Sequence, residues 1–120
     1  MAPTRALATT VHDPESRLVE LLRRHSDAVR ASSTVAVAAV TRQTAEATIE
    51  ALHAAGITPV VEDDCGVGQA RRTAVRAVTE AGATSVLYCD LDRWLHWREF
   101  WPQELADLPA RLEEIGRAHV

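Results

Sequence analysis

The sequence predicts an α/β protein in which a Rossmann-like parallel sheet is flanked by helices. Short apolar segments rich in Val, Ile and Thr alternate with longer segments in which apolar residues recur with helical periodicity. Strands and helices alternate along the chain up to a fourth strand, which is the order that crossover connections between parallel strands produce. With 120 residues, 47% of them hydrophobic, the chain corresponds to one domain at most.

Four segments are apolar and contain β-branched residues, and they are predicted as strands: residues 6–11, 34–40, 57–61 and 86–89. The second, TVAVAAV, is a continuous apolar run, which is typical of a strand covered by helices on both faces. We expect the fourth strand beside the first, with the second and third running outward on the other side. A ligand would then bind beyond the carboxyl ends of the first and fourth strands, where the strand order reverses.

The segments between the strands carry signals for the start and the end of helices. Asp13 suits an N-cap and Pro14 the first helical position, so the first helix is expected to begin there. Gly56 and Gly82 are predicted to end the second and third helices. The segment after the fourth strand is predicted to be helical over residues 93–113, with breaks near its two prolines, Pro102 and Pro109.

Composition and charge exclude some classes of protein. The net charge of −4 and the pI of about 5.7 are opposite to the basic surface of nucleic-acid-binding domains. No apolar run approaches the roughly 18 residues of a membrane span, and no signal peptide opens the chain. Cys65 and Cys89 lack metal or CxxC spacing, and both are expected to be free thiols, with Cys89 buried. We therefore expect a cytoplasmic protein without a nucleic-acid partner.

The two ends of the chain are expected to lie outside the folded unit. Residues 1–5 form a short polar start that is predicted to be flexible. The last six residues, IGRAHV, are the translation of a widely used short-read sequencing adapter, and Glu114 fits the same reading frame. We therefore expect residues 115–120 to be foreign and residues 6–113 to be an N-terminal fragment of a longer natural protein.

Asp90-Leu91-Asp92 follows the fourth predicted strand directly. Two carboxylates at the end of an apolar strand suit a hard cation such as Mg²⁺ or Mn²⁺, which takes oxygen ligands from one or two carboxylates and from substrate phosphates. The alternative is structural, with one of the two aspartates capping the next helix.

A glycine-bearing loop precedes the third helix. Gly66 and Gly68 stand just before the expected helix start at Gln69, and Arg71 and Arg72 follow in its first turn. Glycines at this position permit a ligand to approach the backbone and the amide donors of the helix start. The alternative is a tight loop followed by surface arginines.

Aromatic residues follow the Asp90-Leu91-Asp92 motif. Trp94, Trp97 and Trp101 are spaced by three and four residues, so they either form one apolar helix face or stack on a sugar or a base. His96 either reaches the same site from the first turn of the helix or is a partly exposed helix residue.

From residue 66 to residue 92 the chain reads GVGQARRTAVRAVTEAGATSVLYCDLD. This segment resembles GT-A-fold, family-2-like nucleotide-sugar glycosyltransferases, in which a glycine-bearing loop and an Ala-Arg pair open a helix and the next strand ends in a DxD motif. VHDPE and YCDLDRWLHW are similar to an uncharacterised bacterial branch of this superfamily. The resemblance implies the N-terminal nucleotide-binding half of a GT-A fold, which transfers a sugar from a UDP- or GDP-sugar to an unknown acceptor with Mn²⁺ or Mg²⁺ as cofactor.

The resemblance also implies roles for individual residues. Asp92 would be the main metal ligand, and Asp90 would contact the ribose or the metal. Arg71 would lie beside the base or the phosphates, and the end of the first strand would line the nucleotide pocket. The nucleotide site implied in this way comprises Val11, His12, Asp13, Gly66, Gly68, Arg71 and Asp90, and the metal site comprises Asp92 and Asp90.

The chain departs from the family pattern in residues that concern base recognition. Arg72 stands where family members often carry Asn, and Thr41-Arg42-Gln43 follows the second strand where many have an acidic turn. Glu62, Asp63 and Asp64 follow the third strand and either compensate for this loss or form a solvated charged loop. The general base of an inverting enzyme normally lies in the second half of the fold, so no catalytic residue is assigned.

Two other functions fit the same residues. One is a non-catalytic α/β nucleotide-binding or regulatory domain, which would bind a nucleotide in the presence of EDTA. The other is a phosphatase or phosphotransferase with a nucleophilic Asp in a DxD motif. That family usually carries the motif on its first strand, with Thr or Val two residues after the second Asp, whereas here the motif follows the fourth strand and Trp94 takes that place.

Overall fold

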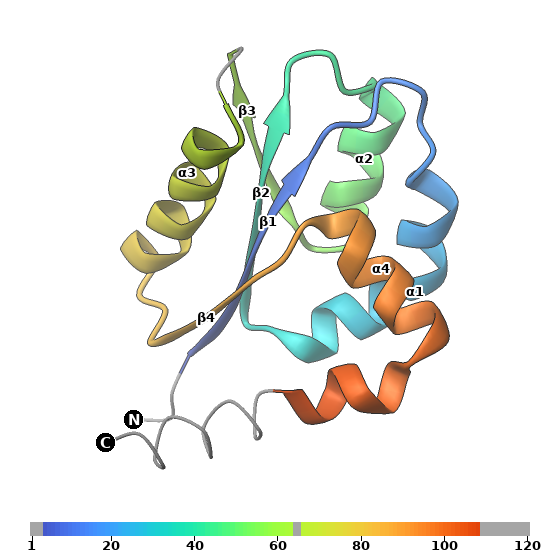
Figure 1. The fold of residues 1–120 in the computed structure, drawn as a ribbon, viewed down its shortest axis with the longest axis vertical. Helices are drawn as coiled ribbons and strands as arrows, with labels where there is room; N and C mark the ends of the chain where they lie inside the picture. The colour runs from blue at the N-terminus through green and yellow to red at the C-terminus, as the bar shows by residue number, and fades with distance from the viewer. Residues whose placement is uncertain (1–3, 64–65, 109–120) are drawn as a thin grey trace.

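The computed structural model describes residues 4–63 and 66–108, and these residues form a four-stranded parallel sheet in the order β3-β2-β1-β4 (Figure 1). The strands are β1 (Arg5–Val11), β2 (Val35–Thr41), β3 (Thr58–Glu62) and β4 (Ser85–Tyr88). The predicted α/β class and the predicted strand order are confirmed. Residues 1–3 of the expected flexible start, Cys65, Pro109 and the whole expected tail lie outside the described residues.

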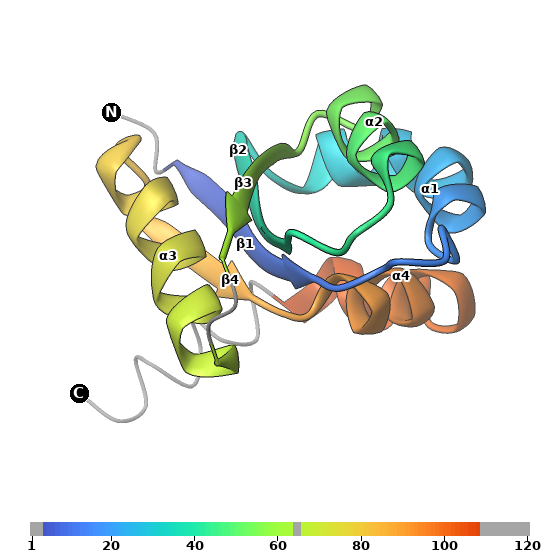
Figure 2. The same cartoon turned by 90° about the horizontal axis from the view of Figure 1, so that it is seen from above.

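The helices cover both faces of the sheet, so that the molecule has three layers (Figure 2). They are α1 (Val19–Ser32), α2 (Glu46–Ala54), α3 (Val67–Glu80) and α4 (Leu91–Phe100). α3 packs alone on one face, and α1, α2 and α4 lie on the other. Residues 102–108 form a further helical segment after α4.

Alternate residues of the two central strands supply the two cores. Leu7 and Val11 of β1 face the α1, α2 and α4 side, where they belong to one buried cluster with Leu22 and Trp94. Ala6 and Ala8 face the other side, in a cluster with Ala74 and Val78 of α3. The prediction that residues 34–40 form a strand covered on both faces is confirmed, since Ala36 and Val37 fall in different clusters.

The first helix begins later than its sequence signals predict. Pro14 and Glu15 lie in a turn, and α1 starts at Val19. Ser16 has a φ of 58°, a left-handed conformation that interrupts a right-handed helix. The prediction that the helix starts at Pro14 is therefore wrong.

The helices after β3 and β4 begin earlier than predicted. α3 starts at Val67, so Gly68 belongs to its first turn and not to the preceding loop. α4 starts at Leu91 with Asp90 as its N-cap residue, so Asp92 also lies within a first helical turn. The expected ends are confirmed, because Gly56 and Gly82 follow the C-cap residues of α2 and α3 and adopt positive φ values of 81° and 95°.

The segment beyond β4 packs by its apolar side. Trp94 is 2% exposed and Trp97 packs against the same core, as the apolar-face hypothesis predicts. Trp101 lies past the end of α4, at the expected break before Pro102, and is 55% exposed, so the hypothesis is wrong for this residue. Cys89 is half-buried and not fully buried, because β4 is paired on only one side among the described residues.

Polar contacts hold α4 against α1. The Nη1 atom of Arg24 lies 2.7 Å from Oε1 of Glu99, and the ring of His25 bonds the other oxygen of the same carboxylate. The hydrogen bond with His25 is the main reason why the pKa of Glu99 lies below its ordinary value.

In the part of the chain that the structure describes, no helix is long and apolar enough to cross a bilayer.

Candidate functional site

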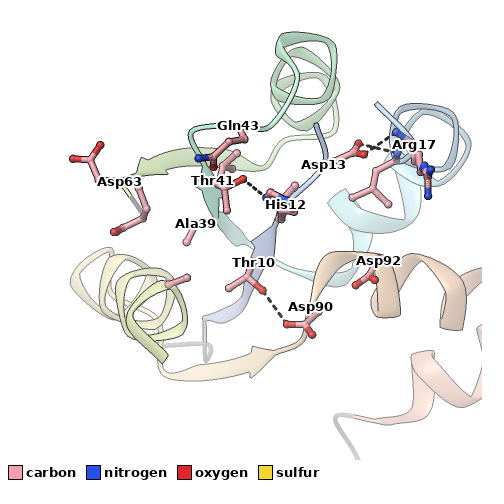
Figure 3. A pocket seen from close by; sticks show the side chains of 15 residues that line it. Thr10, His12, Asp13, Arg17, Ala39, Thr41, Gln43, Asp63, Asp90 and Asp92 are labelled. Atoms are coloured by element: carbon pink, nitrogen blue, oxygen red, sulfur yellow. Dashed lines mark hydrogen bonds between the residues drawn. The ribbon is translucent and has the colours of Figure 1, made fainter. Parts of the chain in front are cut away.

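A cavity of about 480 Å³ lies at the carboxyl ends of the strands (Figure 3). It extends from the junction of β4 and α4 across the ends of β1 and β2 to the end of β3. This includes the position beyond β1 and β4 where the strand order predicts a ligand site. The described residues that line it are Thr10, Val11, His12, Asp13, Arg17, Leu18, Ala39, Val40, Thr41, Gln43, Glu62, Asp63, Ala70, Asp90 and Asp92.

The structure brings most of the predicted site residues to this cavity. Val11, His12 and Asp13 line it from β1 and the loop that follows, and Asp90 and Asp92 line it from the start of α4. They meet because the carboxyl ends of parallel strands, and the helix starts that follow them, lie at the same edge of the sheet.

The predicted residues at the start of α3 do not line the cavity. Gly66, Gly68 and Arg71 are absent from its wall, to which α3 contributes Ala70. Gly66 has an ordinary φ of −64°, and a Cβ atom built on it meets no other atom within 4 Å. Neither the backbone conformation nor the space around Gly66 therefore requires a glycine. Its role toward a ligand stays a prediction.

Asp90 is held by two hydroxyl groups. Thr10 Oγ1 donates a hydrogen bond to Asp90 Oδ1 over 2.9 Å, and the hydroxyl of Tyr88 donates to the same oxygen over 3.0 Å. The two hydroxyl oxygens are themselves 3.2 Å apart, but each has one hydrogen, and the carboxylate takes both. Among the described residues, none donates to Oδ2 of Asp90, so this oxygen is available to a ligand.

The register of the sheet explains this arrangement. β1 and β4 pair Ala8 with Tyr88, so Thr10 and Asp90 follow at equivalent positions two residues further on. Side chains two residues apart on a strand share a face, which puts Tyr88 beside Asp90. Neither Thr10 nor Tyr88 belongs to the site that the sequence predicts. The available signal was a polar residue two positions before the motif and another near the carboxyl end of the neighbouring strand.

Asp92 lies more openly than Asp90. It is exposed in the first turn of α4, and its Oδ1 atom accepts a hydrogen bond from the backbone N–H of Arg93 over 2.9 Å. Among the described residues, no group of three or more His, Cys, Asp or Glu side chains could hold a metal ion. A cation bound by Asp90 and Asp92 would therefore need further oxygen ligands from water or from a bound substrate, which is how Mg²⁺ is usually held beside phosphates.

Asp13 is a buried structural carboxylate. It is 4% exposed and accepts hydrogen bonds from the backbone N–H groups of Arg17 and Leu18 and from the hydroxyl of Thr48, over 2.7 to 2.9 Å. Burial alone would raise the pKa of Asp13, but these bonds outweigh it, so the pKa lies below its ordinary value. Asp13 thereby ties the loop after β1 to α2, although its charge still borders the cavity.

A chain of hydroxyl groups positions His12. Its Nδ1 atom lies 2.7 Å from Thr41 Oγ1, which in turn lies 2.9 Å from Thr44 Oγ1. Thr44 Oγ1 accepts the backbone N–H of Asp13 over 3.0 Å. The His12 ring is thus held at the end of β2. Thr41 lines the cavity, although its sequence context, Thr41-Arg42-Gln43, predicted only a departure from the family pattern.

Arg71 reaches the site through Tyr88. Its guanidinium lies 4.6 Å from the centre of the Tyr88 ring, within the range of a cation–π interaction. Arg71, Tyr88 and Asp90 therefore form a series of contacts from the start of α3 to the cavity wall. The contact with a base or phosphates that the family resemblance implies for Arg71 stays a prediction.

The cavity is strongly acidic. Five carboxylates line it among the described residues, against the single guanidinium of Arg17. Arg17 is itself paired with Glu15, and Asp63 is paired with Arg42, both pairs being largely exposed. The surplus of negative charge repels a phosphate group unless a cation accompanies it.

No family model, no curated protein and no solved structure matches this chain. The function is therefore inferred from the geometry and charge of the cavity and from the sequence motifs at its edge.

Proposed function

We propose that this cavity binds the diphosphate of a nucleotide sugar together with Mg²⁺ or Mn²⁺, and that the chain is the nucleotide-binding part of a GT-A-type glycosyltransferase. The observation that carries the proposal is the position of Asp90 and Asp92, which line one cavity with His12 at the carboxyl ends of parallel strands. Open α/β sheets bind their ligands at this edge.

The residues present fit a cation that is shared with phosphates. Asp90 offers Oδ2 while Thr10 and Tyr88 hold its other oxygen, and Asp92 offers a second, exposed carboxylate. Two carboxylates leave coordination positions for phosphate oxygens. A divalent cation bound there would supply electrostatic stabilisation of the diphosphate that leaves when the sugar is transferred.

The acidity of the cavity makes binding depend on the cation. Because five of the described residues at its wall are carboxylates, the cavity repels a nucleoside diphosphate that arrives without a cation. Asp13 keeps its charge at neutral pH, since its pKa is lowered, but its hydrogen-bonding capacity is used within the protein. Asp13 therefore holds the loop after β1 against α2, and Asp90 and Asp92 would hold the cation.

Isothermal titration calorimetry tests the proposal. UDP and GDP are titrated into the protein with Mn²⁺, and again after EDTA is added. We expect binding with Mn²⁺ that EDTA abolishes and that Asp92→Ala weakens by about tenfold or more. Asp27→Ala is the matched control, because Asp27 is a fully exposed carboxylate of α1 that does not line the cavity. Its affinity should equal that of the unmodified chain.

A non-catalytic nucleotide-binding domain is the second candidate, because the cavity lies at the edge where open α/β sheets bind ligands, a position that does not itself require a metal. It predicts binding of UDP or GDP that persists in EDTA and in Asp92→Ala. Absence of binding under every condition would contradict both candidates. A transferase that binds its donor would next be screened for hydrolysis of UDP- and GDP-sugars.

A further inference from the structure

A second cavity, of about 530 Å³, lies at the opposite end of the sheet. It is bounded by the starts of β1 and β4, the end of α1, α4 and the helical segment 102–108. The starts of β1 and β4 and the segment 102–108 lie in the lower half of Figure 1. None of the residues proposed to bind the nucleotide or the metal lines it. Its volume falls within the range of about 300–1,000 Å³ that is usual for small-molecule sites.

The wall of this cavity is mostly apolar. Leu7, Leu87, Trp94 and Leu105 line it, three of them buried in the core, so the apolar surface is backed by rigid packing. Val86 of β4 also lines it and is 36% exposed, a considerable exposure for a strand valine. An apolar body that entered the cavity would remove this surface from water, which is favourable.

The charge of the cavity is exclusively positive among the described residues that line it. Arg5 and Arg98 contribute two guanidinium groups, and no carboxylate is present. Neither arginine has an ion pair or a side-chain hydrogen bond within the part of the chain that the structure describes, although Arg98 is only partly exposed. By contrast, Arg17, Arg24 and Arg42 all pair with carboxylates. Two unpaired guanidinium groups beside an apolar wall attract an anion that carries an apolar body.

We propose that this second cavity binds a small amphiphile with a carboxylate head and a short aliphatic body. The planar guanidinium groups match a carboxylate, which accepts two parallel hydrogen bonds from such a fork. The aliphatic body would lie along Val86 and Leu87, the apolar wall residues of β4 that keep surface open to water. Charge complementarity favours this ligand over a neutral or cationic one, and the proposal is independent of the function of the first cavity.

The test uses the full chain labelled with ¹⁵N, with octanoate as the probe and two-dimensional ¹H–¹⁵N spectra as the readout. We expect saturable shifts at amides around the second cavity, such as Leu7, Leu87 and Trp94, and none at His12 or Asp90. Octanol has the same aliphatic body without the charge, so its affinity should be lower by about tenfold or more.

Arginine variants test whether the two guanidinium groups bind the carboxylate head of octanoate. Arg98→Gln and Arg5→Gln should each raise the dissociation constant of octanoate severalfold, and the double variant by about tenfold or more. Arg76→Gln is the matched control, because Arg76 is an exposed arginine of α3, on the other face of the sheet. Circular dichroism checks that each variant is folded. Either single variant suffices if the other fails to fold.

Five results would overturn the proposal. Octanol binding as tightly as octanoate would show that charge plays no part, and unchanged affinity in the folded variants would exclude the arginines. Shifts confined to the first cavity, or no shifts at all, would exclude the site. Concentration-dependent broadening of the same amides without octanoate would show that a second copy of the chain covers the cavity.

Discussion

The two ends of the sheet carry cavities of similar size and opposite chemistry. The cavity at the carboxyl ends is acidic, and hydrogen bonds at its wall join Thr10 to Asp90 and His12 to Thr41. The cavity at the amino ends is mostly apolar, and the charged residues among its described lining are arginines. Both cavities are bounded by the same strand, β1, so the difference arises along seven residues of one element.

The direction of the helices accounts for part of this difference. Each helix that follows a parallel strand begins at the carboxyl edge of the sheet, where its partial positive charge favours carboxylates, and ends at the amino edge, where cations are favoured. α4 follows this rule, with Asp92 in its first turn and Arg98 in its last. A surplus of one sign is therefore expected at each edge even without a ligand. The unpaired groups beside a cavity are what point to binding.

Removal of Trp94 has the largest expected effect on stability, because its side chain is buried in the core beside the cavity at the amino ends of the strands. Trp94 is 2% exposed, and Trp94→Ala should lower the free energy of unfolding by about 3–5 kcal/mol, by loss of buried area and creation of a cavity. Trp101→Ala, at a 55% exposed tryptophan, should change it by less than about 0.5 kcal/mol. Urea unfolding measures both, and equal effects would contradict the difference in packing.

Asp13, beside the cavity at the carboxyl ends of the strands, should make the free energy of unfolding sensitive to pH as well as to substitution. Asp13→Ala leaves the N–H groups of Arg17 and Leu18 without their acceptor, and should cost about 2–4 kcal/mol at pH 7. Because the folded-state pKa of Asp13 is lowered, its stabilising contribution is complete well above the unfolded value of about 3.9. It is lost as the pH falls from there through the folded-state pKa.

The difference in unfolding free energy between the unmodified chain and Asp13→Ala should therefore shrink below about pH 4. Urea titrations at several pH values measure it, with Asp27→Ala as a control in which the carboxylate is fully exposed. A difference that stays constant down to pH 3 would show that Asp13 is not an ionised acceptor in the folded state.

The sheet could be predicted because its signals are local and repeated. Residues 34–40 are apolar on both faces only if helices cover both, and the alternation of strands and helices leaves few topologies. The start of α1 could not be predicted in the same way. Asp13 has the sequence signals of an N-cap, but its carboxylate also binds Thr48, 35 residues further on, and that contact exists only in the folded chain.

The candidate site could likewise be predicted only where its residues carry a local sequence signal. Asp90 and Asp92 could be identified because they follow an apolar strand directly. Thr10 was overlooked because its partner, Asp90, is 80 residues away and the register between β1 and β4 decides the contact. The cavity at the amino ends of the strands had no sequence signal, since Arg5 and Arg98 belong to no motif and come to line one cavity only through the fold.

Removal of the Tyr88 hydroxyl tests how firmly Asp90 is oriented. Tyr88→Phe takes away one of the two donors to Oδ1 and should cost about 1 kcal/mol of stability. If Asp90 holds a cation, the same change should weaken Mn²⁺-dependent UDP binding severalfold. Calorimetry measures the affinity, and Thr79→Val is the control, because the Thr79 hydroxyl bonds within α3 to the carbonyl of Val75. Unchanged affinity would show that the hydrogen bond from Tyr88 to Asp90 makes no contribution to ligand binding.

The smallest effect concerns Arg71, the residue that links α3 to the acidic end only through an aromatic ring. An exposed cation–π contact contributes about 0.5–1 kcal/mol, so Arg71→Gln should lower stability by that amount. In a Tyr88→Leu background the same substitution should have no effect, because the ring is gone, whereas Tyr88→Phe should preserve it. Arg72→Gln is the neighbouring control, since Arg72 bonds Gln69 over 3.2 Å. A loss of UDP affinity in Arg71→Gln that persists in the Tyr88→Leu background would mean that the guanidinium contacts the nucleotide directly, at its base or at its phosphates, and not through the Tyr88 ring.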